Sequence, residues 1–562
     1  MYTPTHFTRI CTVIALIIAV LVLGYPAAFI VQHGLNSAAW SPNLPMHPTE
    51  WFQELSRYYV NIPLVIATYW EMWHGVSPSF AGGGYVECAV LGCSTIFMGT
   101  MILFSGKLVA LRDPSNMYGN AEWASQGDIN RLNKGLEIGL DPGTGRAVRI
   151  QVEGNLITIA PPRTGKTGGF IIPNLVFSEV NAWAGPAVVI DPKGDVYKAV
   201  KRHRETTMGR TVRCIDPLGY AGGTDRWNPL ALIDPNDVLY LQSMALALLP
   251  QAAQETEAGA YFRSRAVDLI VAAILTTVRN GRADPVSAAN LLMDQEGLLA
   301  ALQGRADQTS VAARGILMME ERARENIVST AEQATQWLRD ERMQAVVQDH
   351  TFDLGDLSNG DVDLFIVLPA DDRKKILAPY VRWLLADLFG SVRKNKPAER
   401  IVAFIDEAFV LGRFGAILEG AGELPGYGIS LWTFWQSRHQ IIETYGPNGA
   451  DTLIGTAEMI NVFNLPAAQP EEIEHWSKAI GTYTGVKLSG GRNGGSGALK
   501  VTGTPEAVRL VPATGLPVLL QRKQVVFLTS SAHTPAPLKL TKTLSYTDPR
   551  FGGLIDVAPP VG

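Results

Sequence analysis

Short runs of mostly apolar residues recur along the chain after about residue 113, and each ends abruptly in a turn or in polar residues. The clearest runs are 156–159, 187–190, 364–368, 401–405 and 429–435. Apolar runs of this length without strict alternation predict strands that are buried on both faces, as in parallel sheets. Strand and helix patterns alternate in this region, so the sequence predicts a doubly wound α/β fold.

This alternation is interrupted once, between about residues 232 and 347. The stretch has no convincing strand and instead carries long helical patterns at 261–278, 287–302 and 311–338. We therefore predict an all-α domain, residues 232–347, inserted into an α/β domain made of residues 113–231 and 348–562. Near the end of the chain, a glycine-rich stretch at 489–497 indicates a flexible loop, and 524–528 indicates a further strand.

Two long apolar segments precede the α/β region, at about 10–31 and about 86–104. Each is long enough to span a bilayer, so residues 1–112 predict a membrane anchor of two transmembrane helices. The alternative for the first segment is a cleaved secretory signal. The loop between them, 33–85, has Arg57 as its only lysine or arginine. Because positive residues favour the inside, we expect a periplasmic loop and a cytoplasmic remainder.

The composition bears on nucleic-acid binding, on disulfide scaffolds and on zinc sites. The chain has 562 residues and a net charge of −5, so bulk charge gives no support to nucleic-acid binding, and any such contact must come from a local patch. Its four cysteines show no framework of spacings, which argues against a disulfide scaffold and against a zinc site.

The turn that follows the run 156–159 ends in Gly-Lys-Thr. Its candidate phosphate-binding residues are Pro162, Arg163, Thr164, Gly165, Lys166 and Thr167. Backbone N–H groups of such a turn, and the positive end of a helix expected to start near Gly165, hold phosphates. Lys166 would contact the β- and γ-phosphates of ATP, and the Thr167 hydroxyl would bind Mg²⁺. The alternative is an ordinary strand–turn–helix with an exposed lysine, because Ala160 stands where the usual pattern has glycine.

Two acidic residues, Asp406 and Glu407, follow the run 401–405 directly. At the carboxyl end of a buried strand these side chains lie where open α/β sheets bind their ligands. Asp406 would hold Mg²⁺ through water, and Glu407 would act as general base toward the attacking water. The alternative is a strand whose acids face solvent, and it becomes much weaker once Lys166 and Thr167 are considered with it.

Two further runs end in polar residues that fit the same sheet. The run 187–190 leads into Asp191-Pro192-Lys193-Gly194-Asp195, and the run 429–435 leads into Gln436. RecA-type motors place a polar sensor of the γ-phosphate at the position of Gln436. The alternative is a buried amide satisfied by the backbone.

Taken together, these features resemble the type IV coupling proteins, the TraG/TraD-like ATPases of conjugation and type IV secretion. The local matches are 118–124, 163–167 with 172–175, 191–195, 228–230, 406–407, 436–437 and 479–484. The resemblance implies a RecA-like P-loop domain in a homo-hexameric ring, anchored in the lipid of the bacterial inner membrane beside a secretion channel and its ATPases. It also implies that residues 232–347 recruit relaxase-bound single-stranded DNA, protein effectors or both, which ATP hydrolysis then delivers.

One departure from the family concerns the arginine that ring motors supply in trans. Some members carry it in the segment that corresponds to 423–428, which has no arginine here. Arg413 and Arg438 are the remaining candidates, and the finger stays unassigned. Two other functions stay open: a docking receptor that uses nucleotide only to hold a ring together, and an FtsK-type DNA pump. The choice between DNA and protein cargo also stays open.

Overall fold

The computed structural model describes residues 111–112, 115–177, 179–249, 252, 255–369, 371–492, 499–529 and 534–556. The two predicted membrane segments, about 10–31 and about 86–104, lie outside these residues. Within the described ranges, no helix is long and apolar enough to cross a membrane. The described residues fall into two compact units.

The smaller unit is built on a three-stranded sheet in the order β1-β11-β12. Its strands are β1 (Leu111–Arg112), β11 (Thr482–Arg492) and β12 (Leu499–Arg509). The loop predicted at 489–497 is therefore wrong over residues 489–492, which belong to β11. Hydrogen bonding to neighbouring strands outweighs the low strand propensity of glycine in this segment.

The larger unit contains an 11-stranded sheet in the order β3-β2-β14-β13-β10-β4-β9-β8-β5-β7-β6. The strands from β10 to β6 are all parallel, and the pairs from β10 to β3 are antiparallel. The parallel strands are β10 (Ala457–Val462), β4 (Asn155–Ile159), β9 (Ile429–Trp435), β8 (Ile401–Ile405), β5 (Ala187–Pro192), β7 (Val362–Leu368) and β6 (Thr211–Ile215). The antiparallel ones are β13 (Lys523–Leu528), β14 (Leu538–Thr541), β2 (Leu136–Leu140) and β3 (Ala147–Ile150). The predicted α/β class with a parallel-rich sheet is confirmed.

Burial on both faces explains the apolar runs in the sequence. In β4, Ile157 and Ile159 belong to one hydrophobic core, whereas Leu156 belongs to the core on the other face. The helices that accompany the sheet are α5 (Gln126–Arg131), α6 (Ile172–Val176), α7 (Asp195–Thr206), α15 (Arg373–Lys394), α16 (Gly415–Glu423), α17 (Arg438–Gly455), α18 (Pro470–Ile480) and α19 (Leu516–Arg522).

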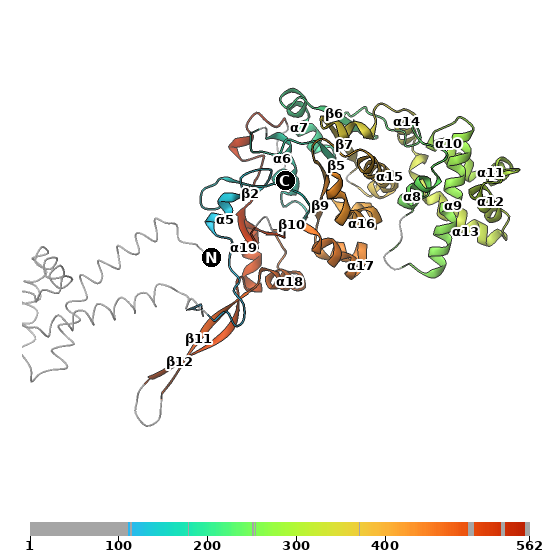
Figure 1. Cartoon of the computed structure of the whole chain (residues 1–562). Coiled ribbons are helices and arrows are strands. Elements are labelled where there is room, and N and C mark those ends of the chain that lie inside the picture. Colours follow the sequence, from blue (N-terminus) through green and yellow to red (C-terminus); the bar gives the residue numbers. More distant parts are fainter. Residues whose placement is uncertain are drawn as a thin grey trace, which may run out of the picture. The chain divides into compact units, whose positions relative to one another are not determined.

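Seven α-helices lie between β6 and β7 in the described chain, and we call them the helical insertion. They are α8 (Val238–Leu248), α9 (Glu257–Arg279), α10 (Pro285–Met293), α11 (Gln295–Leu302), α12 (Gln308–Leu317), α13 (Glu321–Thr335) and α14 (Glu341–Gln348). Figure 1 shows α8 to α13 gathered together, with α15 next to α8.

Two helices expected in this region are shorter than predicted. The pattern at 287–302 forms α10 and α11, because Asp294 accepts a hydrogen bond from the Gly297 N–H and caps a new helix. The pattern at 311–338 is divided among α12, α13 and the 3₁₀ turn η2 (Gln336–Arg339). An aspartate that caps a helix competes with continuation of the preceding one, which periodicity alone does not reveal.

Candidate nucleotide site

The predicted site residues lie along the carboxyl-terminal edge of the larger sheet, which is the edge at which its parallel strands end. They follow the carboxyl ends of β4, β9, β8 and β5, which are consecutive parallel strands. Strand β9 lies between the strand that leads to Lys166 and the strand that leads to Asp406. This edge is where open parallel sheets bind ligands.

The turn between β4 and the next helix is held by local hydrogen bonds and by backbone in the left-handed region. Arg163 has φ 59° and Gly165 has φ 91°. The Thr164 hydroxyl donates to the Pro161 carbonyl at 2.7 Å. Pro162 and Arg163 are exposed, and residues 164–167 are partly buried. The turn therefore has a defined shape with its backbone accessible at the sheet edge.

The helix after this turn begins at Thr167, later than expected, and its first part is the π-turn η1 (Thr167–Ile171). Gly168 and Gly169 form this part, and the segment after β14 packs closely against both. The Ser545 N–H donates to the Gly168 carbonyl at 3.0 Å. A Cβ on Gly169 would lie 2.9 Å from the Thr543 carbonyl oxygen, so this contact requires glycine. The sequence pattern alone gives no indication that the segment 543–546 belongs to the site.

Lys166 is folded back over its own turn. Its Nζ donates to the carbonyl oxygens of Ala160 at 2.7 Å and of Pro161 at 3.3 Å. Burial lowers the pKa of the Lys166 ammonium, and the carboxylates of Asp406 and Glu407 oppose this shift. The lysine thus lies within electrostatic reach of both acids that the sequence paired with it.

Thr167 and Asp406 are in direct contact, although 239 positions separate them in the chain. The Thr167 hydroxyl donates to the Asp406 Oδ2 at 2.6 Å. Burial raises the pKa of Asp406, while the Thr167 hydrogen bond and the Lys166 charge lower it. A hydroxyl and a carboxylate side by side suit Mg²⁺, which prefers oxygen ligands and takes others from phosphates and water. In the described part of the chain, no cluster of three or more His, Cys, Asp or Glu side chains is arranged to hold a metal by itself.

Glu407 has an unusual backbone conformation and a charged partner. Its φ is 71° and its ψ is 60°, in the left-handed region that residues other than glycine seldom adopt. Its Oε1 accepts from the Nζ of Lys374 at 2.7 Å. Lys374 was missed in the sequence analysis. The signal was available, because the charged stretch 371–375 closely follows β7 at the same edge of the sheet.

Asp191 and Lys193 lie at the same edge, Asp191 in the last part of β5 and Lys193 directly after this strand. The Asp191 carboxylate is 1% exposed and accepts from the Tyr197 N–H at 2.8 Å. The pKa of Asp191 is raised to about 7, mainly by burial and also by the nearby Asp406 charge, while backbone hydrogen bonds from Tyr197 and Val196 oppose this shift. Lys193 has φ 78°, and its charge lowers the pKa of Asp406. The Asp-Pro-Lys-Gly turn therefore contributes both a buried acid and a cation to this edge.

The raised pKa of Asp191 predicts a pH-dependent stability. The folded protein keeps a proton up to about pH 7 that the unfolded chain, with a pKa of 3.8, releases earlier. The free energy of unfolding of the wild type should therefore fall relative to Asp191→Asn as the pH rises from about 4 to about 7, and then stay constant. Thermal unfolding midpoints of both proteins, measured without nucleotide across this range, check the prediction. A difference that does not change with pH would contradict it.

Gln436 follows β9, so the structure places it between the turn that carries Lys166 and the acids after β8. Its N–H donates to the Gln440 Oε1 at 2.8 Å. The two candidate arginine fingers make contacts within the chain: Arg413 donates to the Tyr445 carbonyl at 3.3 Å, and Arg438 pairs with Asp451 at 3.3 Å. These contacts assign neither arginine to a neighbouring subunit.

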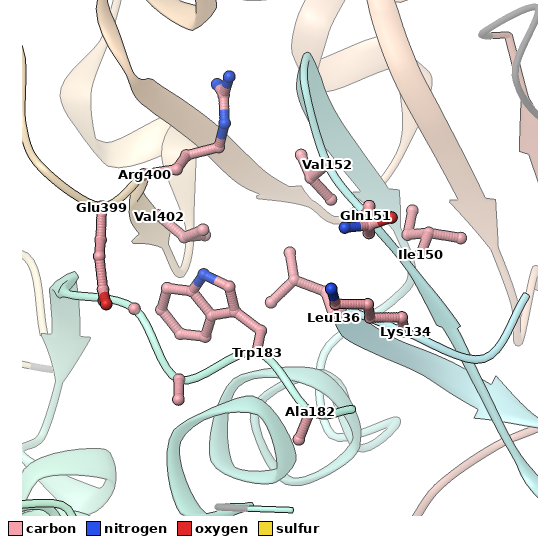
Figure 2. Close-up of a pocket in the computed structure, with 13 residues that line it drawn as sticks. Lys134, Leu136, Ile150, Gln151, Val152, Ala182, Trp183, Glu399, Arg400 and Val402 are labelled. Carbon is pink, nitrogen blue, oxygen red and sulfur yellow. The ribbon is translucent and has the colours of Figure 1, made fainter. Parts of the chain in front are cut away.

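A separate cavity of about 350 Å³ lies at the amino-terminal edge of the sheet, where β5 and β8 begin (Figure 2). Residues before β5 and β8 line it, together with the start of β2 and the end of β3, and they include Lys134, Trp183 and Arg400. In Figure 2 the Trp183 ring lies in the middle of this lining. Because β5 and β8 are parallel and carry Asp191 and Asp406 at their other ends, this cavity is not part of the candidate nucleotide site.

A profile of the family described as "Type IV secretory system Conjugative DNA transfer" matches residues 122–554. The chain therefore belongs to this family, the type IV coupling proteins that the motifs resemble.

Similar proteins agree with this assignment. A conjugal transfer protein TraG of Escherichia coli is 25% identical over 76% of this chain and 74% of its own length. The coupling protein VirD4 of Bartonella henselae is 25% identical over 50% of this chain and 47% of its own length. The solved structure of the bacterial conjugative coupling protein TrwBdeltaN70 has the same fold, with a TM-score of 0.57 and 17% identity over 76% of this chain and 96% of that chain.

Proposed function

We propose that this chain is a hexameric coupling ATPase of a bacterial inner membrane. In this proposal it recruits a relaxase–DNA complex, protein effectors or both, and uses ATP hydrolysis to deliver them to a type IV secretion channel. The observation that carries the proposal is the 2.6 Å contact between the Thr167 hydroxyl and Asp406. It joins the phosphate-binding turn to the acidic strand end, as a phosphoryl-transfer site requires.

The names of the relatives support this function. The family is described by conjugative DNA transfer, and the relatives are conjugal transfer and type IV secretion coupling proteins. TrwB, which shares the fold, has been solved with ADP and Mg²⁺ (TM-score 0.53, 16% identity). We extend nucleotide and Mg²⁺ binding to this chain on the fit of its own residues. In this scheme residues 1–112 anchor the protein in lipid, residues 113–231 and 348–562 form the motor, and the helical insertion within residues 232–347 recruits substrate.

Each residue has a separate task in the proposed mechanism. Bound Mg²⁺ would neutralise charge on the phosphates, held by Thr167 directly and by Asp406 through water. Backbone N–H groups of residues 162–167 and the Lys166 ammonium bind and orient the phosphates. Glu407 takes a proton from the attacking water, and Gln436 contacts the γ-phosphate from the intervening strand.

Replacing Thr167 tests the metal site in this mechanism. Thr167→Val keeps the shape of the side chain but removes the hydroxyl, whereas Thr167→Ser keeps the hydroxyl. We expect Thr167→Val to lower Mg²⁺-dependent ATP turnover by roughly 10- to 100-fold, the value of a hydrogen bond or ligand bond to a charged group, and Thr167→Ser to stay near the wild type. Phosphate release measured over a Mg²⁺ titration checks this. Equal turnover of the valine and serine proteins would refute the assigned role of Thr167.

A further inference from the structure

The ion pair between Lys374 and Glu407 occupies the carboxylate that the proposed mechanism needs as a base. The two side chains meet at 2.7 Å, and their exposed fractions are 15% for Lys374 and 27% for Glu407. A pair this sheltered is screened less than a surface ion pair. While the pair is formed, the Lys374 ammonium holds Oε1 of Glu407 and fixes the orientation of this carboxylate.

Lys374 owes its position to helix α15, in whose first turn it lies after β7. The next residue, Lys375, has the same charge but a side chain that is 67% exposed, and it pairs with Asp372 at 3.9 Å. Helix α15 contacts β7 and η4 (Ala408–Leu411), the turn directly after Glu407. The location of α15 therefore decides whether Lys374 reaches Glu407.

The other contacts of α15 reach into the helical insertion. Arg382, in the middle of α15 and 6% exposed, donates to the carbonyls of Ala247 at 2.7 Å and Leu248 at 3.0 Å. Both carbonyls belong to the last turn of α8, where helix carbonyls lack partners and the helix dipole is negative. The same guanidinium donates to the Leu411 carbonyl of η4 at 2.8 Å.

A second contact joins the same two helices. The Tyr240 hydroxyl of α8 donates to Oδ1 of Asp387, one turn beyond Arg382 in α15. Burial lowers the pKa of Arg382 to about 10 and raises the pKa of Asp387, as expected for charges enclosed between packed helices. Arg382 thus fixes α15 at once to the helical insertion and to the turn that follows the candidate base.

We propose that Lys374 is a positioning residue that restrains Glu407, and that α15 makes this restraint depend on the position of the helical insertion. The proposal rests on the function proposed above. A shift of α8 moves Arg382 and Asp387, hence α15, and withdraws Lys374 from Glu407. Cargo bound on the helical insertion then releases the base, and turnover without cargo stays low.

ATP turnover of the assembled full-length protein, measured without cargo, tests the restraint. We expect Lys374→Ala to raise kcat roughly 2- to 30-fold with KM unchanged, which is the range for substitutions that alter coupling between sites. Lys374→Arg keeps the ion pair, so its turnover should equal that of the wild type. Lys375→Ala removes the same charge one residue away and should match the wild type.

Two results would overturn the restraint. One is equal ATP turnover of the Lys374→Ala and Lys375→Ala proteins, and the other is turnover of Lys374→Ala as low as that of Glu407→Gln. The first result would show that the ion pair has no effect on turnover. The second would show that Lys374 takes part in the reaction. Neither result affects the proposed function. That function fails instead if the wild type has no turnover, or if Glu407→Gln keeps wild-type turnover.

A double-mutant cycle tests transmission through α15. Arg382→Lys keeps the charge but loses most of the three carbonyl contacts, and it should also raise turnover. Because it acts through Lys374, it should add nothing in the Lys374→Ala background. If Arg382→Lys does not fold, as judged by its thermal unfolding, Tyr240→Phe removes the other α8 contact and serves in the same cycle. Additive effects would overturn the role of α15.

Discussion

The Glu407→Gln protein is expected to bind ATP and hydrolyse it about 10²- to 10⁴-fold more slowly than the wild type, the usual contribution of a general base. Glutamine keeps the size of the side chain and can still hydrogen bond, but it does not take a proton from water at neutral pH. Lys166, Thr167 and Asp406 remain in place, so the dissociation constant for ATP should change by only a few-fold. Phosphate release and binding of a fluorescent ATP analogue measure the two effects separately.

An exposed glutamate on α16 provides the control for this substitution. Glu419→Gln removes the same charge away from the site and should leave turnover unchanged. If the assembled Glu407→Gln protein hydrolyses ATP at the wild-type rate, Glu407 is not the base. If DNA transfer or secretion also continues in a strain that carries this variant, the chain acts as a docking receptor instead of a motor.

Lys166→Ala should have its largest effect on binding. The ammonium already lies beside the carbonyls of Ala160 and Pro161 and within reach of Asp406, so it can move onto a bound phosphate without leaving its turn. Loss of one charge-assisted contact corresponds to roughly a 10- to 100-fold weaker affinity for ATP. Equilibrium binding of ATP with Mg²⁺, compared with binding of ADP, measures this loss.

Lys198→Ala is the matched control, because Lys198 is an exposed lysine on α7 away from the phosphate-binding turn. It should bind ATP like the wild type. A Lys166→Ala protein that also binds ATP like the wild type would show that the phosphates lie elsewhere. The carbonyl contacts of Lys166 would then be purely structural.

Most of the parallel strands, and the approach of the turn that carries Lys166 and Thr167 to the acidic pair Asp406 and Glu407, were predictable from the sequence. A strand buried on both faces leaves a local signal, an uninterrupted apolar run, as β8 and β9 show. Parallel strands bring their carboxyl ends to one edge, so the residues after those runs had to converge. Thr167 and Asp406 meet for this reason, despite their separation in the chain.

Lys374 and the segment 543–546 were not predicted, because their roles depend on packing between distant parts of the chain. A lysine in a charged stretch looks the same whether it faces solvent, as Lys375 does, or a carboxylate, as Lys374 does. The close contact between Gly169 and Thr543 has a similar origin, since two glycines after Thr167 do not tell which segment they admit. Helix breaks such as the one at Asp294 depend on capping, which periodicity does not encode.

The packing of residues 543–546 on Gly168 and Gly169 makes the candidate phosphate-binding turn depend on a segment that is synthesised much later. The segment that supports the candidate phosphate-binding turn is synthesised after the whole helical insertion, whereas the turn itself precedes that insertion. A growing chain therefore lacks the finished turn until residues 543–546 have been added. Premature termination after β13 would yield a protein that holds nearly all the named reactive side chains but not the scaffold behind them.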